Sequence, residues 1–319
     1  MSVFPLIRLK PGFLNEMQQK KMEIKKYLRN YLYEVSTYVL VDKKNINYFN
    51  YLNNDEPYKL VNPMSDEHLY VRKNLSSSLL NVISYNIARQ NKDFGIFEIS
   101  NINDKSCKKK QFLAIVLTGD YKIQGDLIKY SYSFFSLKGF FNGIINILNL
   151  NINKFTFKEF DIKNNEFHPS KSAFIYFDDK IIGYLGELHP NIYRCFNIKN
   201  NKVLIMEIDL DFLFKIKSNE FKFSSFSNFP TVKRDLSLIV NNDLKIEEII
   251  NLVKKNGGPL VKDVSVFDLY KNENFLNKKS ISISIFLIKN NDTLKDEEIK
   301  LVMEKIKLAL LEKKIIIRS

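Results

Sequence analysis

The sequence of 319 residues predicts an α+β protein that is built from two domains. A chain of this length is large enough to form two separate hydrophobic cores. Over residues 1–214, helical patterns and antiparallel-strand patterns mix without a regular βαβ alternation, which is typical of an α+β core. Over residues 228–319 the predicted order is β-α-β-β-α-β, the ferredoxin-like arrangement. Between them, the polar, serine-containing stretch 215–227 is the predicted linker.

The elements of the first domain follow from hydrophobic periodicity. In residues 15–32, apolar and aromatic side chains recur on one helical face with lysines opposite, which predicts an amphipathic helix. The β-branched stretch VSTYVLVD predicts a strand over 35–42. The elements predicted after it are a helix over 75–90, strands over 94–99 and 111–118, a helix over 135–150, a hairpin over 171–188 that turns at Asp178-Asp179, and a last apolar stretch that ends near residue 214.

In the second domain every predicted strand alternates and both predicted helices begin with acidic residues. Carboxylates favour a helix start because they interact well with the positive end of the helix dipole. The pair Glu247-Glu248 and the triplet Asp296-Glu297-Glu298 supply them, and Gly257-Gly258-Pro259 predicts the end of the first helix. The predicted elements are strands over 234–240, 261–269, 279–289 and 315–318, and helices over 246–256 and 296–311.

Composition restricts the class of protein. The formal net charge of +13 suggests an anionic partner, but the cations are spread over both domains and do not single out one face. No run of about 18 apolar residues occurs, so no membrane span is predicted. The N-terminus lacks a signal-peptide pattern, and Cys107 and Cys195 lack metal-ligand spacing. These observations predict a cytoplasmic protein with free thiols.

Motifs for catalysis by this chain alone are absent from the sequence. It contains no GxxxxGK[ST], GxGxxG, HExxH or CxxC. The histidines His68, His168 and His189 are scattered, and the last two each precede a proline, which favours roles in turns. The acidic pairs fall at a hairpin tip or at helix starts, where turn and dipole preferences explain them. The sequence therefore predicts neither a metal site nor an enzyme that acts alone.

Three stretches, found in the same order as in one known family, carry a resemblance over essentially the whole chain. NPMSDEHLYVRKNLSSSLLNVISYN resembles the NP-S-E---(M/V)R-SLLPGLL segment of the β subunit of bacterial-type phenylalanine–tRNA ligase. FHPSKSAFIYFDDKIIGYLGELHP is similar to the HPG-SA and GE-HP motifs of that subunit. FPTVKRDLSLIV is similar to the FP-V-RDLA-VV opening of its C-terminal anticodon-binding domain.

The resemblance implies the fold of the C-terminal portion of such a subunit. Residues 1–214 are expected to form a degenerate core with the antiparallel sheet of class II aminoacyl-tRNA synthetases. Residues 228–319 are expected to form the ferredoxin-like anticodon-binding domain. The editing domain, the tRNA-binding-like domain and the magnesium-binding module of the family do not occur in this sequence. Both a fragment and a naturally shortened subunit are compatible with that.

The family's division of labour implies that this chain is a non-catalytic subunit. The catalytic α subunit performs adenylation with ATP and Mg²⁺, and the two subunits form an α2β2 heterotetramer; this chain is expected to bind neither cofactor alone. A working class II site needs an arginine on the ATP α-phosphate and a second arginine in a glycine-rich motif. Only Arg72 lies in a comparable segment, YVRKNL lacks an acidic partner, and no glycine-rich arginine motif occurs.

The predicted helix over 15–32 is the candidate contact with the α subunit, because class II folds build their dimer interface from the corresponding helix and strand. Its candidate interface residues are Ile24, Tyr27, Leu28 and Tyr31. The alternative is an ordinary surface helix.

The resemblance also implies contacts with the anticodon of phenylalanine tRNA. Unpaired bases are recognised by an aromatic face for stacking and by polar groups for the base edge. In DLYKNENFLNKKS, Tyr270 is the candidate for stacking, Asp268 for accepting from N1 and N2 of guanine, and Ser280 for a further hydrogen bond. The candidates for phosphate contacts are Lys233, Lys271, Lys278 and Lys279. Alternatively, Asp268 accepts backbone N–H groups in the turn and Tyr270 is half-buried.

The stretch KRD over 233–235 is interpreted mainly as a strand entry, in which Arg234 pairs with a nearby acid. Three functions follow from the sequence as a whole. The first is a ligase subunit that supports ATP-dependent attachment of phenylalanine to its tRNA. The second is a free-standing tRNA-binding or assembly protein without aminoacylation activity. The third is a single-chain organellar ligase, against which the missing arginine motifs argue. No DNA or membrane partner is expected.

Overall fold

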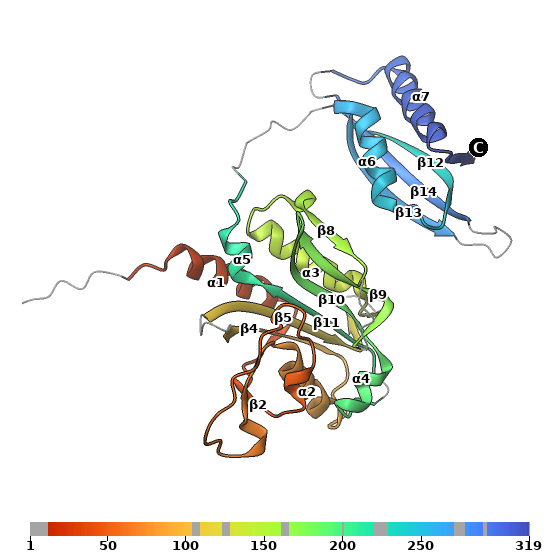
Figure 1. Cartoon of the computed structure of the whole chain (residues 1–319). Coiled ribbons are helices and arrows are strands. Elements are labelled where there is room, and N and C mark those ends of the chain that lie inside the picture. Colours follow the sequence, from red (N-terminus) through yellow and green to blue (C-terminus); the bar gives the residue numbers. More distant parts are fainter. Residues whose placement is uncertain are drawn as a thin grey trace, which may run out of the picture. The chain divides into compact units, whose positions relative to one another are not determined.

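The computed structural model describes residues 12–103, 109–122, 128–160, 166–199, 201–219, 229–270, 278–289 and 292–318. The chain divides into two compact units, Met1–Glu220 and Phe221–Ser319, each with its own sheet (Figure 1). Both units combine helices with mainly antiparallel strands, so the predicted α+β class is confirmed. None of the helices within the described residues is long and apolar enough to cross a membrane.

The first unit is organised around a seven-stranded sheet of order β1-β4-β5-β11-β10-β9-β8. All neighbouring strands are antiparallel except β1 and β4, which are parallel. The strands are β1 (Tyr33–Glu34), β4 (Phe94–Asn103), β5 (Lys109–Thr118), β8 (Phe155–Lys158), β9 (Phe167–Phe177), β10 (Lys180–Leu188) and β11 (Val203–Asp209). Two small ribbons pair β2 (Leu40–Val41) with β3 (Tyr70–Val71) and β6 (Asp120–Lys122) with β7 (Lys129–Ser131).

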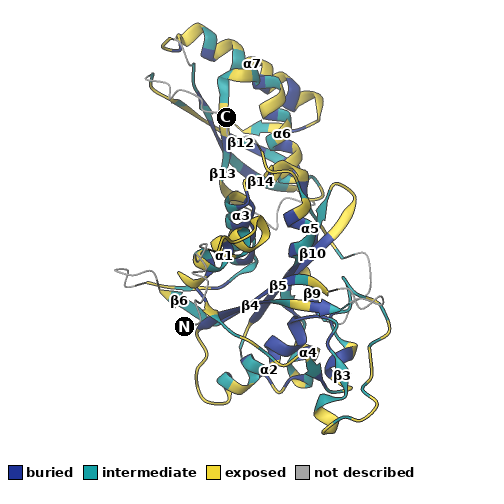
Figure 2. Cartoon of the chain, turned by 90° about the vertical axis from the view of Figure 1, so that its left-hand side faces the viewer, coloured by how far each residue is buried: buried dark blue, intermediate teal, exposed yellow. Residues whose placement is uncertain are grey.

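Helices cover both faces of this sheet, which explains why its central strands are continuous apolar runs. On one face, α1 (Glu16–Arg29) and α3 (Phe134–Ile147) pack over a core that includes Phe97 and Leu113. On the other face, α2 (Ser76–Ile87) and α4 (Pro190–Cys195) pack over a core that includes Ile96 and Phe112. In Figure 2 the buried strands lie between these two layers. The short helix α5 (Leu210–Lys215) follows β11.

The single strand predicted over 35–42 is wrong. In place of one long strand, two strands of two residues each form: β1 directly before this stretch and β2 near its end. Val35 still donates to the carbonyl of Phe97 at 2.9 Å, but the chain then leaves the sheet. The reason is that Thr37 and Val39 contact Arg72 instead. The backbone N–H of Arg72 donates to the carbonyl of Val39 at 2.9 Å, and the guanidinium of Arg72 donates to the hydroxyl of Thr37.

The second unit has the predicted βαββαβ order, with an antiparallel four-stranded sheet of order β13-β14-β12-β15. Its helices α6 (Ile246–Gly257) and α7 (Asp296–Glu312) lie on the same face of the sheet (Figure 1). Gly258 has a φ of 62° and ends α6, and Glu298 accepts from the backbone of Lys295 at the start of α7. The strands are β12 (Val232–Asn241), β13 (Val261–Tyr270), β14 (Lys278–Leu287) and β15 (Ile316–Arg318).

Alternation separates the two faces of this sheet. Leu238, Ile281 and Ile283 point toward the helices and are fully buried in the core of the unit. The residues between them point to the opposite face, which no described helix covers. We call this the open face. It positions the candidate site described next.

Candidate functional site

The open face of the second unit aligns polar side chains in a row across all four strands. The antiparallel register pairs Asp268 with Ser282, Ser282 with Ser237, and Ser237 with Arg318. The next row along the hairpin pairs Tyr270 with Ser280. These six residues line an open hollow of about 320 Å³. The register thus brings together the three side chains that the sequence predicts for base recognition.

The geometry leaves the two main candidates accessible. Tyr270 is 55% exposed, so its ring is available to a stacking partner. Asp268 is exposed, and no described residue donates a hydrogen bond to its carboxylate or pairs with it. Beside them, the hydroxyl oxygens of Ser237 and Ser282 lie 3.2 Å apart, and each is able to donate or accept. The hollow therefore offers one aromatic ring, one acceptor-only group and several hydroxyls.

The predicted phosphate contacts differ in their surroundings. Lys278 is exposed at the start of β14. Lys279 donates to the carbonyls of Asn242 and Leu244, both at 2.8 Å, which fixes its ammonium group against the backbone. The ammonium of Lys233 lies 5.6 Å from the centre of the Phe267 ring. Lys271 lies outside the described residues.

The local ion pair predicted at the entry of β12 involves a different cation. Asp235 pairs with Lys233 at 3.4 Å, whereas Arg234 donates to the carbonyl of Lys233. Residues 233 and 235 share one face of the strand and residue 234 points to the other, so alternation decides the pairing. A hydrogen bond from Ser284 at 2.7 Å and the nearby Lys233 ammonium lower the pKa of Asp235.

Sequence reasoning missed Ser237, Ser282 and Arg318. The predicted hairpin would have been enough to place residue 282 opposite residue 268, because the residue numbers of paired positions in an antiparallel hairpin add up to a constant. The position of the last strand beside the first one is a property of the ferredoxin-like order. Arg318 therefore lies on the open face at the row of Ser237, where it adds a cation to the rim of the hollow.

The predicted interface on α1 is partly buried within this chain. Ile24 and Leu28 are 0% exposed in the core under α3, which leaves them no surface for a partner. The two tyrosines are more accessible: Tyr31 is 63% exposed, and its ring centre lies 5.6 Å from that of Tyr27. Both rings also contact Phe140 of α3 edge-on. The candidate contact surface thus narrows to Tyr27 and Tyr31.

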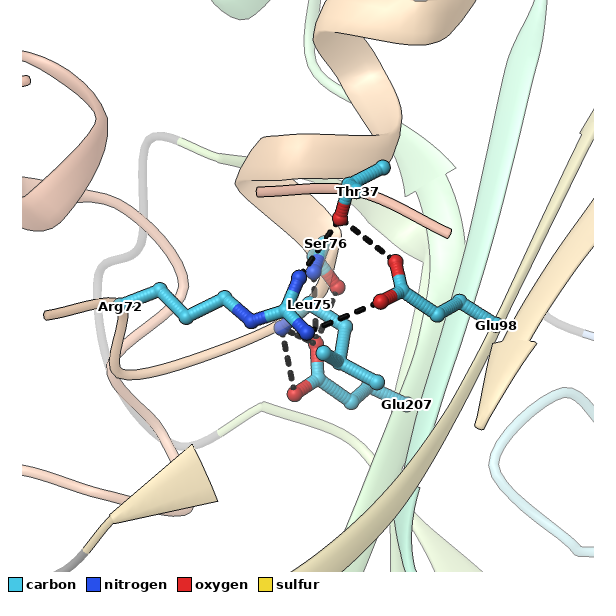
Figure 3. A network of polar contacts seen from close by, with 6 residues as sticks. All are labelled: Thr37, Arg72, Leu75, Ser76, Glu98 and Glu207. Carbon is cyan, nitrogen blue, oxygen red and sulfur yellow. Dashed lines mark hydrogen bonds and ion pairs between the residues drawn. The ribbon is translucent and has the colours of Figure 1, made fainter. Parts of the chain in front are cut away.

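A buried polar network lies between α2 and the sheet of the first unit (Figure 3). Arg72 is 2% exposed, and its guanidinium pairs with Glu98 of β4 at 2.9 Å. The hydroxyl of Thr37 accepts from Arg72 and donates to Glu98, both at 2.6 Å. The acidic partner that the stretch YVRKNL lacks is supplied by Glu98, which lies on β4 of the seven-stranded sheet. A guanidinium neutralised in this way does not fit a nucleotide phosphate.

A second carboxylate in the same network caps α2. Glu207 of β11 accepts from the backbone N–H groups of Leu75 and Ser76, from the Ser76 hydroxyl at 2.6 Å and from the Tyr184 hydroxyl at 2.9 Å. Burial raises the pKa of Glu207, although these donors oppose the shift. Over the described ranges, no three histidine, cysteine, aspartate or glutamate side chains group to hold a metal ion.

Of the two histidines predicted to lie in turns, His189 directly precedes α4, but the prediction is wrong for His168, which lies in β9. His189 caps the start of α4 by accepting from the backbone N–H of Asn191 at 3.2 Å. His168 accepts from the backbone N–H of Ser170 at the same distance. His68 belongs to a different setting, with its ring centre 5.4 Å from that of Tyr38.

Comparison with known proteins identifies the family. Residues 1–210 match the model of the phenylalanyl tRNA synthetase beta chain CLM domain. The chain belongs to the phenylalanyl-tRNA synthetase β chain family. Residues 227–318 match the ferredoxin-fold anticodon binding domain, which agrees with the fold of the second unit. The resemblance inferred from the three sequence stretches is thereby confirmed.

Individual members of the family show how much of a β subunit this chain represents. The β subunit of phenylalanine–tRNA ligase from Staphylococcus aureus is 31% identical over 315 residues, which cover 96% of this chain and 38% of the relative. The protein of strain MSSA476 is 30% identical with the same coverage. The chain thus spans 38% of the length of these relatives. A solved pyrrolysyl tRNA synthetase from Desulfitobacterium hafniense has a TM-score of 0.45 and 10% identity over 62% of this chain and 67% of that chain, a likeness too weak to carry an argument.

Proposed function

We propose that this chain acts as the β subunit of phenylalanine–tRNA ligase, supporting ATP-dependent attachment of phenylalanine to its tRNA. Its first unit scaffolds a catalytic α subunit through Tyr27 and Tyr31, and its second unit binds the anticodon. The α subunit supplies the chemistry with ATP and Mg²⁺, in a cytoplasmic α2β2 assembly. The observation that carries this proposal is the open face, where Asp268, Tyr270 and Ser280 line one hollow.

Binding at the open face follows from the chemistry of the hollow. An unpaired base stacks on Tyr270, because an exposed ring offers the π-face that every base accepts. The Asp268 carboxylate accepts from N1–H and N2–H of a guanine, the first anticodon base expected for phenylalanine tRNA. Ser280 adds a hydrogen bond, and Arg318 and Lys278 neutralise phosphates on either side.

Co-expression with the α subunit of the same organism tests the proposed function. We expect a stable complex that charges phenylalanine tRNA, whereas the chain alone should show no ATP–pyrophosphate exchange. The free-standing tRNA-binding protein predicts tRNA binding by the chain without any complex. If the two subunits fail to associate, or the complex does not aminoacylate, the ligase-subunit proposal is wrong.

Replacing Tyr270 with alanine should weaken tRNA binding by about 1–3 kcal/mol, the usual contribution of one stack between a base and an aromatic ring. Adenylation by the complex should stay unchanged, because the adenylating chemistry belongs to the α subunit. Filter binding or fluorescence titration with phenylalanine tRNA measures the difference in Kd.

The control for Tyr270→Ala is Tyr85→Ala, which removes a tyrosine of similar exposure, 59%, from the first unit. Thermal unfolding of both variants should match that of the parent. A folded Tyr270→Ala protein that binds tRNA with the parent's affinity would show that no base stacks on this ring.

Replacing Asp268 with asparagine should remove discrimination at the first anticodon base. The amide oxygen accepts from one guanine donor, but the amide NH₂ group opposes the other. We expect the variant to lose about 1–3 kcal/mol of preference for guanine over adenine at this position. Titration with tRNAs that differ only at the first anticodon base measures that preference.

Lys278→Ala provides the contrast for Asp268→Asn. Loss of a phosphate contact should weaken all tRNAs about equally and reduce the salt dependence of binding. Equal loss of affinity for every anticodon in Asp268→Asn would instead assign Asp268 a general role.

A further inference from the structure

The first unit contains a second hollow, of about 730 Å³, that the proposed function does not use. It lies between the segment that follows β1, the short helix η2 (Asp66–His68) and the outer side of α2. Its volume is within the range of roughly 300–1,000 Å³ that is common for ligand pockets. We call it the α2 hollow.

Three residues that line the hollow each have a buried polar atom without a partner among the described residues: the side-chain oxygen of Asn45, the Nδ1 atom of His68 and the hydroxyl of Ser78. Asn45 is 8% exposed and Ser78 is 6% exposed. Buried polar groups are almost always hydrogen-bonded, because an unsatisfied one destabilises the fold. Each of these three atoms is able to accept a hydrogen bond, so the residues that line the hollow favour a ligand that donates hydrogen bonds.

The charge of the wall is opposite to that of the chain. The chain carries a net charge of +13, yet the residues lining the α2 hollow include Asp42 and Glu67 and no lysine or arginine. Neither acid forms an ion pair with any residue in the described ranges. Within the described part of the chain, Asp42 accepts only from the backbone N–H of Asn45, at 2.7 Å. The nearby guanidinium of Arg72, behind Thr37, is already paired with Glu98 at 2.9 Å. The α2 hollow therefore favours a positive charge.

An aromatic ring completes one side of the hollow. Tyr38 is 79% exposed, and its ring packs edge-on against His68 with centres 5.4 Å apart. A cation over the face of an exposed tyrosine is attracted by the ring quadrupole. The same wall thus presents acceptors, carboxylates and a π-face.

We propose that the α2 hollow binds a hydrogen-bond-donating cation, a guanidinium or an alkylammonium group. Guanidinium fits best, because its planar fork of five N–H donors reaches several separate acceptors at once. Such a group is available as a free polyamine-like molecule or as an arginine or lysine side chain of a partner protein. The proposal is independent of tRNA binding and of association with a catalytic subunit.

Titration of the full chain by calorimetry tests the proposal with agmatine, which carries a guanidinium and an ammonium group. N-carbamoylputrescine, in which a neutral urea replaces the guanidinium, is the matched ligand control. We expect agmatine to bind at least about tenfold more tightly, a difference of ~1.4 kcal/mol. Glu67→Gln should weaken agmatine binding about tenfold, because it removes one charge from the exposed helix η2 without disturbing the core. Glu56→Gln, an exposed glutamate outside the hollow, should leave the affinity unchanged.

Two further ligands distinguish the sources of the cation. If N-acetyl-arginine amide binds as tightly as agmatine, the hollow is built for a protein side chain. If spermidine binds tightly and the blocked arginine does not, it is built for a free cation. Both results support the proposal. Equal affinities for agmatine and its urea analogue, or an unchanged affinity in Glu67→Gln, would overturn it.

Discussion

Replacing Arg72 with methionine should lower the free energy of unfolding of the first unit by about 3–5 kcal/mol, because it leaves the Glu98 carboxylate buried without its cation. Arg72 and Glu98 are both 2% exposed, so water cannot take over the lost interaction. Hydrogen exchange followed by mass spectrometry measures the change, since it reports on each unit of the full chain separately.

The double variant Arg72→Met with Glu98→Leu should recover most of that loss, because it removes the uncompensated charge as well. The matched control is Lys171→Met. Lys171 pairs with Glu187 at 3.2 Å, but its side chain is 50% exposed, and such pairs contribute only about 0–1 kcal/mol. A loss below ~1 kcal/mol in Arg72→Met would mean that the Glu98 carboxylate finds another partner in the folded chain.

This network also explains why one part of the fold escaped prediction. The strand expected over 35–42 rested on β-branched residues, which indicate a pleated, half-buried surface but do not show which partner strand is present. Here the chain leaves β4 after Val35 because Thr37 contacts Arg72 and Glu98, and that contact joins residues far apart in the sequence. A local pattern cannot contain such information. Elements whose evidence is local, such as α6 and α7, were predicted nearly to the residue, and the hairpin of β9 and β10 was predicted with its turn and its end, although β9 begins earlier, at Phe167.

In the candidate site, too, the residues within one hairpin could be predicted from the sequence, whereas those brought in from distant strands could not. Asp268, Tyr270 and Ser280 were predictable because they belong to one hairpin. In a hairpin, the alternation of side chains and the short loop determine which side chains lie on the same face of the sheet. Ser237 and Arg318 come from β12 and β15, so their places depend on the order of strands in the sheet. On α1, periodicity correctly identified one face, but could not tell a face that packs on α3 from one that contacts another chain. Ile24 and Leu28 prove to be the former.

Replacing Glu207 with alanine should destabilise the first unit by about 3 kcal/mol or more. The change leaves the backbone N–H groups of Leu75 and Ser76 and the hydroxyls of Ser76 and Tyr184 without their shared acceptor. Each buried donor that loses its partner costs about 1–3 kcal/mol. Because two of these donors open α2, exchange protection should fall first in that helix. Glu187→Ala, which loses only contacts with the exposed Lys171 and Lys202, is the control.

Glu207→Gln tests the charge of this group separately from its hydrogen bonds. Burial raises the pKa of Glu207 in the folded chain, so folding favours its protonated form. The contribution of Glu207 to the free energy of unfolding is therefore fully present below the ordinary glutamate pKa. It is lost as the pH rises through the raised pKa that this group has in the folded chain. Glutamine does not titrate, so the stability difference between parent and Glu207→Gln should narrow as the pH rises. Burial also raises the pKa values of Glu166 and Asp209, but both remain in the variant and cancel in the difference. A difference that widens with pH would show that the four donors stabilise the carboxylate more than burial penalises it.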